Sequence, residues 1–142
     1  FFQRTVPYPM LMTFDAPNST ATCTRRERSN TPLQALTLWN DPVFFDCART
    51  LGRKLMGEPT IEARLDQAFE TCLARPPTPA ERTRLRQLYD DQTRLTAEEP
   101  ASAKSILGLE ADAALPADPI AQAAVVAAVR TLMNLDEFIT RD

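Results

Sequence analysis

The sequence predicts an all-α fold of about five helices packed around a buried C-terminal helix, with an extended or irregular N-terminal segment. Apolar side chains recur at helical spacing from residue 32 onwards. Residues 120–129 carry no charge, so a helix there has no face suited to water, and we expect it to lie at the centre. Helix starts are marked by a capping residue followed by proline, at Thr31-Pro32, Asp41-Pro42, Thr78-Pro79 and Asp118-Pro119.

The N-terminal segment, residues 1–31, shows no sustained helical or strand period and contains Pro7, Pro9 and Pro17. A short strand over residues 11–14 is compatible with the pattern. Water would be an unfavourable environment for the many large apolar side chains of this segment, so we expect it to lie across the helices and bury them. These side chains are Phe1, Phe2, Tyr8, Met10, Leu11, Met12 and Phe14.

Residues 32–97 are expected to form four helices. The first should end near Asn40 and the second should run down to Gly57. Thr60 can cap the third, which Pro76 and Pro77 stop, and residues 78–81 have the capping-box pattern of a fourth helix start. Cys47 and Cys72 fall on the apolar faces of these helices and are expected to be buried, and Trp39, Phe44 and Phe45, with Met10 and Met12, are expected in the core.

Residues 98–118 are rich in alanine, proline and acids and are expected to form a loop, with at most one helical turn around residues 102–107. The last helix is expected over residues 119–139. Residues 1–142 should therefore form a single helical domain. Because the chain begins with Phe1 instead of Met, we expect it to be part of a larger protein.

The composition narrows the classes of function. The chain lacks histidine, which excludes a Ser-His-Asp triad, an H-E-x-x-H zinc site and a C-x-x-C-H haem attachment within it. Its three cysteines have no metal-binding spacing, so we expect no metal and no cofactor. A net charge of −3 argues against general nucleic-acid binding, and no apolar run is long enough for a membrane span.

A candidate anion-binding or interdomain site lies before the first of these four helices. It consists of Arg25, Arg26, Arg28 and Asn30, with Asp15 as an additional member. Guanidinium groups beside a helix N-terminus can bind carboxylate, sulfate or phosphate. The same arginines could instead form ion pairs that hold the N-terminal segment in place, and we favour this structural interpretation.

Three further functional patterns have a more ordinary explanation. Asp15, Asp41 and Asp46 could supply a glycosidase-type carboxylate pair, but Asp41 is better explained as a helix cap and Asp46 as a solvated position. Residues 78–95 could be taken for a DNA-reading helix, although their arginines are offset by acidic residues, which favours a mixed-charge surface. An exposed aromatic side chain could stack on a carbohydrate.

Three stretches resemble a known family, the planctomycete-specific C-terminal domain of unknown function. They are Phe14-Asp15-Ala16-Pro17 with Arg25-Arg26 and residues 31–42, then residues 73–81, then residues 132–138. The family's usual residue at the position of Trp39 is aliphatic. The resemblance implies the end of an exported or periplasmic multidomain protein that also contains a planctomycete cytochrome c domain, with the haem held elsewhere.

The resemblance supplies no catalytic residues. The sequence therefore favours a non-catalytic interaction or scaffold module, whose partners are upstream domains of the same polypeptide. The alternative is part of an enzyme or of an anion- or glycan-binding site that those upstream domains complete. The oligomeric state is not readable from the sequence.

Overall fold

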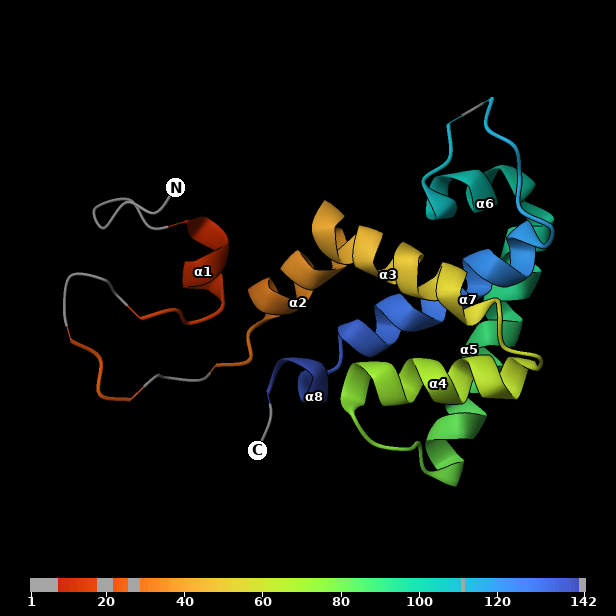
Figure 1. The fold of residues 1–142 in the computed structure, drawn as a ribbon. Helices are drawn as coiled ribbons and strands as arrows, with labels where there is room; N and C mark the ends of the chain where they lie inside the picture. The colour runs from red at the N-terminus through yellow and green to blue at the C-terminus, as the bar shows by residue number, and fades with distance from the viewer. Residues whose placement is uncertain (1–7, 18–21, 26–28, 111, 141–142) are drawn as a thin grey trace.

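The computed structural model of the chain describes residues 8–17, 22–25, 29–110 and 112–140. These residues form eight helices and no strand, which confirms the all-α class but exceeds the five helices expected (Figure 1). No helix of this described part is long and apolar enough to cross a membrane. The helices are α1 (Pro9–Thr13), α2 (Pro32–Asn40), α3 (Pro42–Leu55), α4 (Ile61–Leu73), α5 (Pro79–Glu98), α6 (Pro100–Leu107), α7 (Pro119–Met133) and α8 (Asp136–Ile139).

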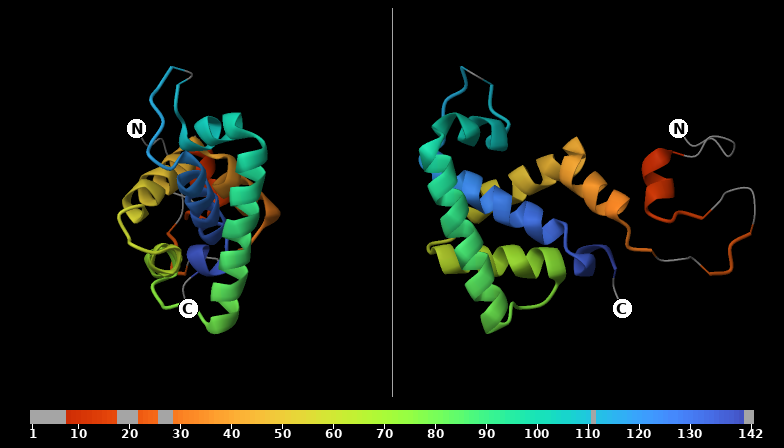
Figure 2. Two further views of the ribbon diagram at one scale, coloured as in Figure 1. Left: turned by 90° about the vertical axis from the view of Figure 1, so that its right-hand side faces the viewer. Right: turned by 180° about the vertical axis from the view of Figure 1, so that it is seen from behind.

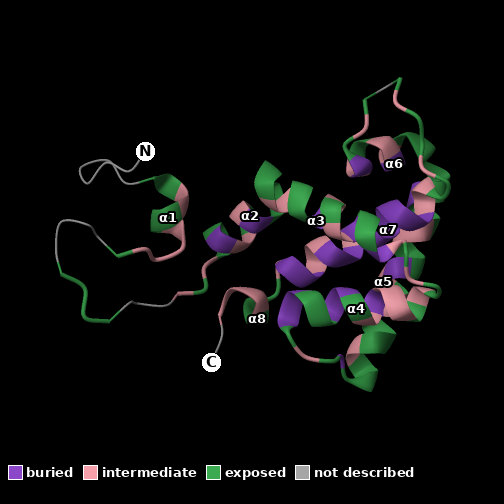
Figure 3. Ribbon diagram, in the orientation of Figure 1, coloured by how far each residue is buried: buried purple, intermediate pink, exposed green. Residues whose placement is uncertain are grey.

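Helix α7 is the centre of the fold, as its uncharged sequence predicted. Helices α3, α4, α5 and α6 all pack against it, and Val125, Val126 and Val129 are completely buried. Figure 3 shows buried residues along most of α7, whereas the surrounding helices are buried on one side. At Gly52 of α3 the backbone comes so close to α7 that an added Cβ would lie 2.6 Å from Val126 Cγ2.

The predicted helix starts are confirmed because their caps act locally. Thr31, Thr60 and Thr78 each accept a hydrogen bond from the backbone N–H three residues later. Asp41 accepts one from Val43 N at 2.8 Å, and Asp118 accepts one from Ala121 N at 3.0 Å. Proline follows four of these five caps at the first helical position, where its missing N–H removes no helical hydrogen bond.

The loop expected over residues 98–118 contains helix α6, which is a correction. Ala103 and Leu107 are buried against the core, so tertiary packing stabilises a helix of eight residues where the sequence indicated a single turn. Gly108 ends it in the left-handed conformation with φ 66°, and Arg49 donates to the last-turn carbonyls of Ser105 and Ile106 at 3.0 and 2.9 Å.

The expected 119–139 helix is also interrupted. It ends at Met133, and α8 begins at Asp136 after the turn at Asn134 and Leu135. The backbone N–H groups of Asn134 and Leu135 donate to carbonyls three residues earlier, which tightens the chain out of the α-helical path.

The N-terminal segment differs most from the expectation. Residues 9–13 form helix α1 instead of a strand, because Pro9 suits the first helical turn. Helix α1 lies at one end of the molecule beyond α2 and does not cross the helical body (Figures 1 and 2). Tyr8, Leu11 and Met12 are 60%, 42% and 48% exposed, so the predicted burial is wrong for them, and Phe1 and Phe2 lie outside the described residues.

Two other core assignments need correction. Cys72 is buried, as predicted, and burial raises the pKa of its thiol to about 11. Cys47 is exposed, because the buried side of α3 is formed by Ala48, Gly52 and Leu55 at helical spacing and Cys47 lies outside that row. Trp39 is likewise 40% exposed, whereas Phe44 and Phe45 pack partly buried against the core.

Candidate functional site

Asp15, the additional member of the predicted anion site, is bound by protein donors in the structure. Asp15 has a positive φ of 55°, and its carboxylate accepts hydrogen bonds from Ser29 N and Ser29 Oγ at 2.7 and 2.6 Å. Carboxylates bound by two short donors of this kind are strongly held. Asp15 therefore fixes the chain entering α2 against the chain leaving α1.

Gln34 completes this connection and was not identified from the sequence. Its side chain is buried, and its amide nitrogen donates to Thr13 O at 2.9 Å, Ser29 Oγ at 3.1 Å and Asp15 Oδ2 at 3.3 Å. Its amide oxygen accepts from Thr31 N at 3.0 Å, which makes a capping box at the start of α2. We call Gln34, Thr13, Asp15, Ser29 and Thr31 the Gln34 network.

The remaining predicted site residues are placed differently. Asn30 is exposed and donates to Asp136 Oδ1 of α8 at 2.7 Å, so it ties the start of α2 to the end of the chain. Arg25 is exposed, and its backbone carbonyl accepts the Cys23 thiol hydrogen at a sulfur–oxygen distance of 3.2 Å. Arg26 and Arg28 lie outside the described residues. Asp15 and Asn30 are thus bonded to different parts of the protein.

The other predicted carboxylates have structural roles in the described chain. Asp41 caps α3, and Asp46 pairs with Arg49 at 2.8 Å. On α5, Arg82 pairs with Asp66, and Arg86 pairs with both Glu62 and Asp90. This is the mixed-charge surface that the sequence predicted for residues 78–95.

A cluster of ionic side chains holds α8 against the start of α5. Arg75 donates to Glu81 at 2.8 Å and to Glu137 at 2.6 Å, and we call these three residues the clasp. The Arg75 guanidinium, together with donors from Thr78, lowers the pKa of Glu81 to about 2. The same guanidinium lowers the pKa of Glu137 and also lies 4.9 Å from the Phe69 ring centre.

The arm, which we define as α1, α2 and the described residues between them, carries an apolar surface. Leu33, Leu36 and Trp39 are 59%, 59% and 40% exposed. Because a helix turns roughly 100° per residue, these three side chains lie within an arc of about 120°. We call them the apolar stripe. The buried residues of α2, Gln34 and Leu38, lie on the opposite side of the helix.

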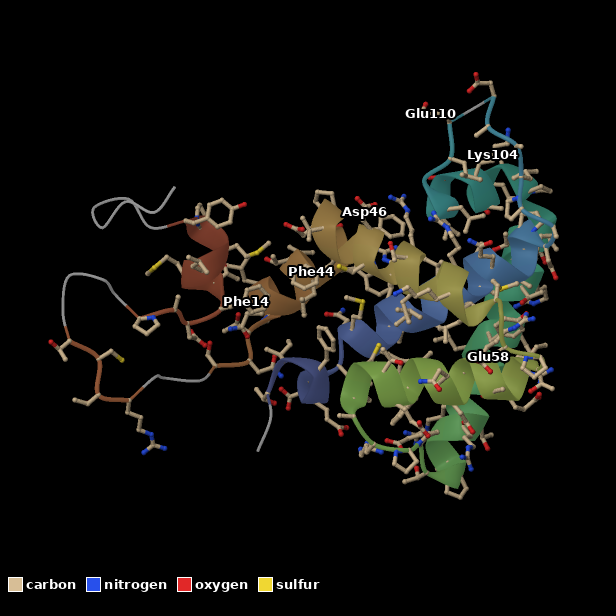
Figure 4. All side chains as sticks on the ribbon, viewed as in Figure 1. Phe14, Phe44, Asp46, Glu58, Lys104 and Glu110 are labelled. Atoms are coloured by element: carbon tan, nitrogen blue, oxygen red, sulfur yellow. The ribbon has the colours of Figure 1, made fainter. Side chains whose placement is uncertain are left out.

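An aromatic ring pair helps to hold the arm to the helical body. The rings of Phe14, after α1, and Phe44, in α3, lie 6.4 Å apart in a tilted arrangement (Figure 4). Aromatic pairs in this geometry are favourable. The ring pair thus joins the arm to α3, whereas the Gln34 network lies within the arm and joins α1 to α2. The apolar stripe faces outward.

Two arginines meet the aromatic side chains at the junction of the arm and the body. The guanidinium carbons of Arg49 and Arg130 each lie 3.9 Å from the Phe45 ring centre, and that of Arg130 lies 4.4 Å from the Trp39 ring centre. Arg130 also donates to the backbone carbonyl of Trp39. We call these four residues the arginine–aromatic stack. In such cation–π contacts the positive guanidinium is attracted to the electron-rich face of the ring, which stabilises the arrangement.

The electrostatic surroundings of the two arginines differ. Arg49 uses all three of its nitrogens, on Asp46 and on the carbonyls of Ser105 and Ile106. Arg130 has no carboxylate partner among the described residues, and burial together with the nearby Arg49 lowers its pKa. In the described part of the chain, no group of three acidic or cysteine side chains is placed to hold a metal ion.

Comparison with known families supplies a further observation. The profile of the family described as PSD1, a protein of unknown function (DUF1553), matches residues 1–89, which is more than half of the chain. The chain belongs to this family. No curated protein and no solved structure matches it significantly.

The DUF1553 match covers the arm, α3, α4 and the first half of α5. It therefore includes the Gln34 network and, within the arginine–aromatic stack, Trp39, Phe45 and Arg49. Arg130 and the whole of α7 lie beyond the matched residues. The stack thus joins the DUF1553-matched region to the helix around which it packs.

Proposed function

We propose that the chain is a non-catalytic interaction module of an exported multidomain protein. In this proposal the arm packs against a neighbouring domain of the same polypeptide. The exposed apolar side chains support it, since monomeric proteins rarely leave a contiguous apolar surface in water unless it binds something. Among the described residues, seven of the ten exposed large apolar side chains lie between Tyr8 and Val43.

The position of the arm supports the same function. Helix α1 stands at one end of the molecule, where a second domain has access to it without disturbing the helices around α7 (Figure 2). The Gln34 network holds α1 and α2 in a fixed relation, so the surface is formed before a partner binds. Preformed surfaces avoid part of the ordering cost of association.

Hydroxyl-radical footprinting would test this function. Met12, Leu36 and Trp39 should be labelled in the 142-residue chain and at least about fivefold less in a polypeptide that also contains the neighbouring domains, as expected when apolar side chains enter an interface. Leu95 and Leu115, which are exposed elsewhere, are the controls and should be labelled equally in both. Equal labelling of the arm in both proteins would rule the proposal out.

The alternative function is part of an enzyme or glycan-binding site built on Asp15 and residues 25–30. We place it second because Asp15 and Asn30 already bond to protein donors and acceptors. A ligand would have to displace the short hydrogen bonds between Asp15 and Ser29, which is unfavourable for buried or half-buried partners.

A further inference from the structure

The apolar stripe leads directly to the arginine–aromatic stack. Leu36 and Trp39 are three residues apart on α2 and are therefore neighbours on its surface, and Arg130 covers one part of the Trp39 ring at 4.4 Å. The outward face of α2 thus passes from two leucines to an indole ring and then to a guanidinium group. The docking surface is therefore apolar at one end and positively charged at the other.

Arg130 is the member of this surface with unused binding capacity. A guanidinium has five N–H donors in a fixed fork, and the hydrogen bond of Arg130 in the described structure uses one nitrogen, on the Trp39 carbonyl. Its neighbour Arg49 repels it and is itself fully engaged. A half-buried cation next to a second cation gains most from an added anion.

We propose that the surface which docks on the arm presents a carboxylate to Arg130, with apolar side chains beside it that cover the stripe of Leu33, Leu36 and Trp39. This inference rests on the proposed function and specifies the chemistry of the partner. The carboxylate binds in the plane of the Arg130 guanidinium and offsets the repulsion from Arg49. The adjoining apolar groups bury the exposed part of the indole ring.

The chain's single tryptophan makes the test direct, because Trp39 fluorescence reports on this site alone. The probe is 3-phenylpropionate, which joins a carboxylate to an apolar ring, and its neutral amide has the same shape without the charge. We expect a saturable change in fluorescence in which the carboxylate binds about tenfold more tightly than the amide, as charge-assisted hydrogen bonds are the stronger kind. Added salt should reduce this preference.

Substitutions of arginine test whether Arg130 causes the preference for the carboxylate. Arg130→Gln should remove the preference for the carboxylate, whereas Arg84→Gln, which removes an exposed arginine on α5, should leave it unchanged. If Arg130→Gln does not fold, the comparison of carboxylate with amide in the unaltered chain still decides. Equal binding of the two probes, or an equal loss in both variants, would overturn the inference.

The two proposals fail separately. Footprint protection of the arm without a carboxylate preference would leave the interaction module standing and remove the role of Arg130. A carboxylate preference without protection in the longer polypeptide would establish the anion site and remove the neighbouring domain as its partner.

Discussion

Gln34 connects segments that are far apart in the sequence through one buried side chain. Its side-chain amide forms hydrogen bonds with Thr13, Ser29 and Thr31. Burying an amide without partners is unfavourable, so the position tolerates glutamine because all of these groups meet there. The orientation of α1 relative to α2 consequently depends on this residue.

Replacing Gln34 with Met should loosen the arm while leaving the helical body intact. Methionine keeps the volume but removes the hydrogen bonds, which costs about 2 kcal/mol because buried backbone groups lose their partners. Hydrogen exchange should show faster exchange at Ala16 N, which bonds Leu11 O, and unchanged rates in α7. Gln87→Met, at an exposed position of α5, is the control. Similar exchange rates at Ala16 in both variants would contradict the role of Gln34.

Glu81 makes stability depend on pH in a defined direction. Its pKa falls from an ordinary 4.5 to about 2 in the folded chain, chiefly because Arg75 donates to it. A carboxylate with a lowered pKa in the folded state stabilises the fold above its unfolded pKa, and the contribution is lost as the pH falls from 4.5 towards 2. Glu137 shifts in the same direction, so the whole clasp weakens in acid.

The measurement compares thermal unfolding of the unaltered chain and of Glu81→Gln between neutral pH and pH 2. The unaltered chain should be the more stable one at neutral pH, and the difference should shrink as the pH falls through this range. Glu99→Gln, which removes an exposed carboxylate at the end of α5, serves for comparison. A difference that stays constant with pH would show that the clasp does not contribute through its charge.

At the scale of helices, the contact between α3 and α7 depends on a missing side chain. A Cβ at Gly52 would lie 2.6 Å from Val126 Cγ2, and Val126 is completely buried. Alanine in a helix is favoured over glycine by about 1 kcal/mol. Overpacking a tight core costs about 1–3 kcal/mol, and we expect this larger effect to decide.

Gly52→Ala should therefore lower the free energy of unfolding, by up to about 2 kcal/mol. Val126→Ala alone should cost about 2 kcal/mol through the cavity that it leaves. Combined, the two changes should cost less than their sum by about 1 kcal/mol, because the new methyl group occupies part of the vacated space. Urea unfolding measures all four proteins, and Gly57→Ala, at an exposed position, is the control. Strict additivity would contradict the close contact.

The helix starts could be predicted because their signals are local. A capping side chain and a following proline act within one turn, and Thr31, Asp41, Thr60, Thr78 and Asp118 all cap as their sequence context indicates. Thr31 and Gln34 also have capping-box spacing, which could have identified Gln34 as a capping residue. Its burial could not be predicted, since that depends on Asp15 taking a positive φ and bringing α1 back towards α2.

The full length of helix α6 and the exposure of the arm were missed for a different physical reason. The alanines and the proline of residues 98–107 are compatible with a loop. The helix is stabilised by the packing of Ala103 and Leu107 in the core beside α7. The apolar side chains of α1 and Trp39 of α2 were expected inside because water is unfavourable for them, yet that rule does not say which surface covers them. Arg130 and Trp39 are 91 residues apart, so their contact is a property of the folded chain.

At the scale of the whole molecule, the DUF1553 match and the folded unit have different boundaries. The match ends at residue 89 within α5, whereas α7, which every large helix of the body contacts, begins at Pro119. The matched helices α3, α4 and α5 therefore turn their buried faces towards a segment outside the match. Residues beyond the match are thus needed to complete the core.

A chain that ends at residue 98 should consequently fail to fold, although it contains every residue of the match. It lacks five large apolar buried side chains of α7, and burial of each contributes about 1.5–3 kcal/mol. Together they match the total stability of a typical domain, about 5–15 kcal/mol, so no stable core remains. Circular dichroism should show little helix and no cooperative melting. A chain that ends at residue 135 keeps α7 and loses α8, and with it Glu137 of the clasp and the Asp136 partner of Asn30. It should still melt cooperatively, at a lower temperature. A folded, cooperative fragment of residues 1–98 would show that α7 is an accessory to the fold and not its centre.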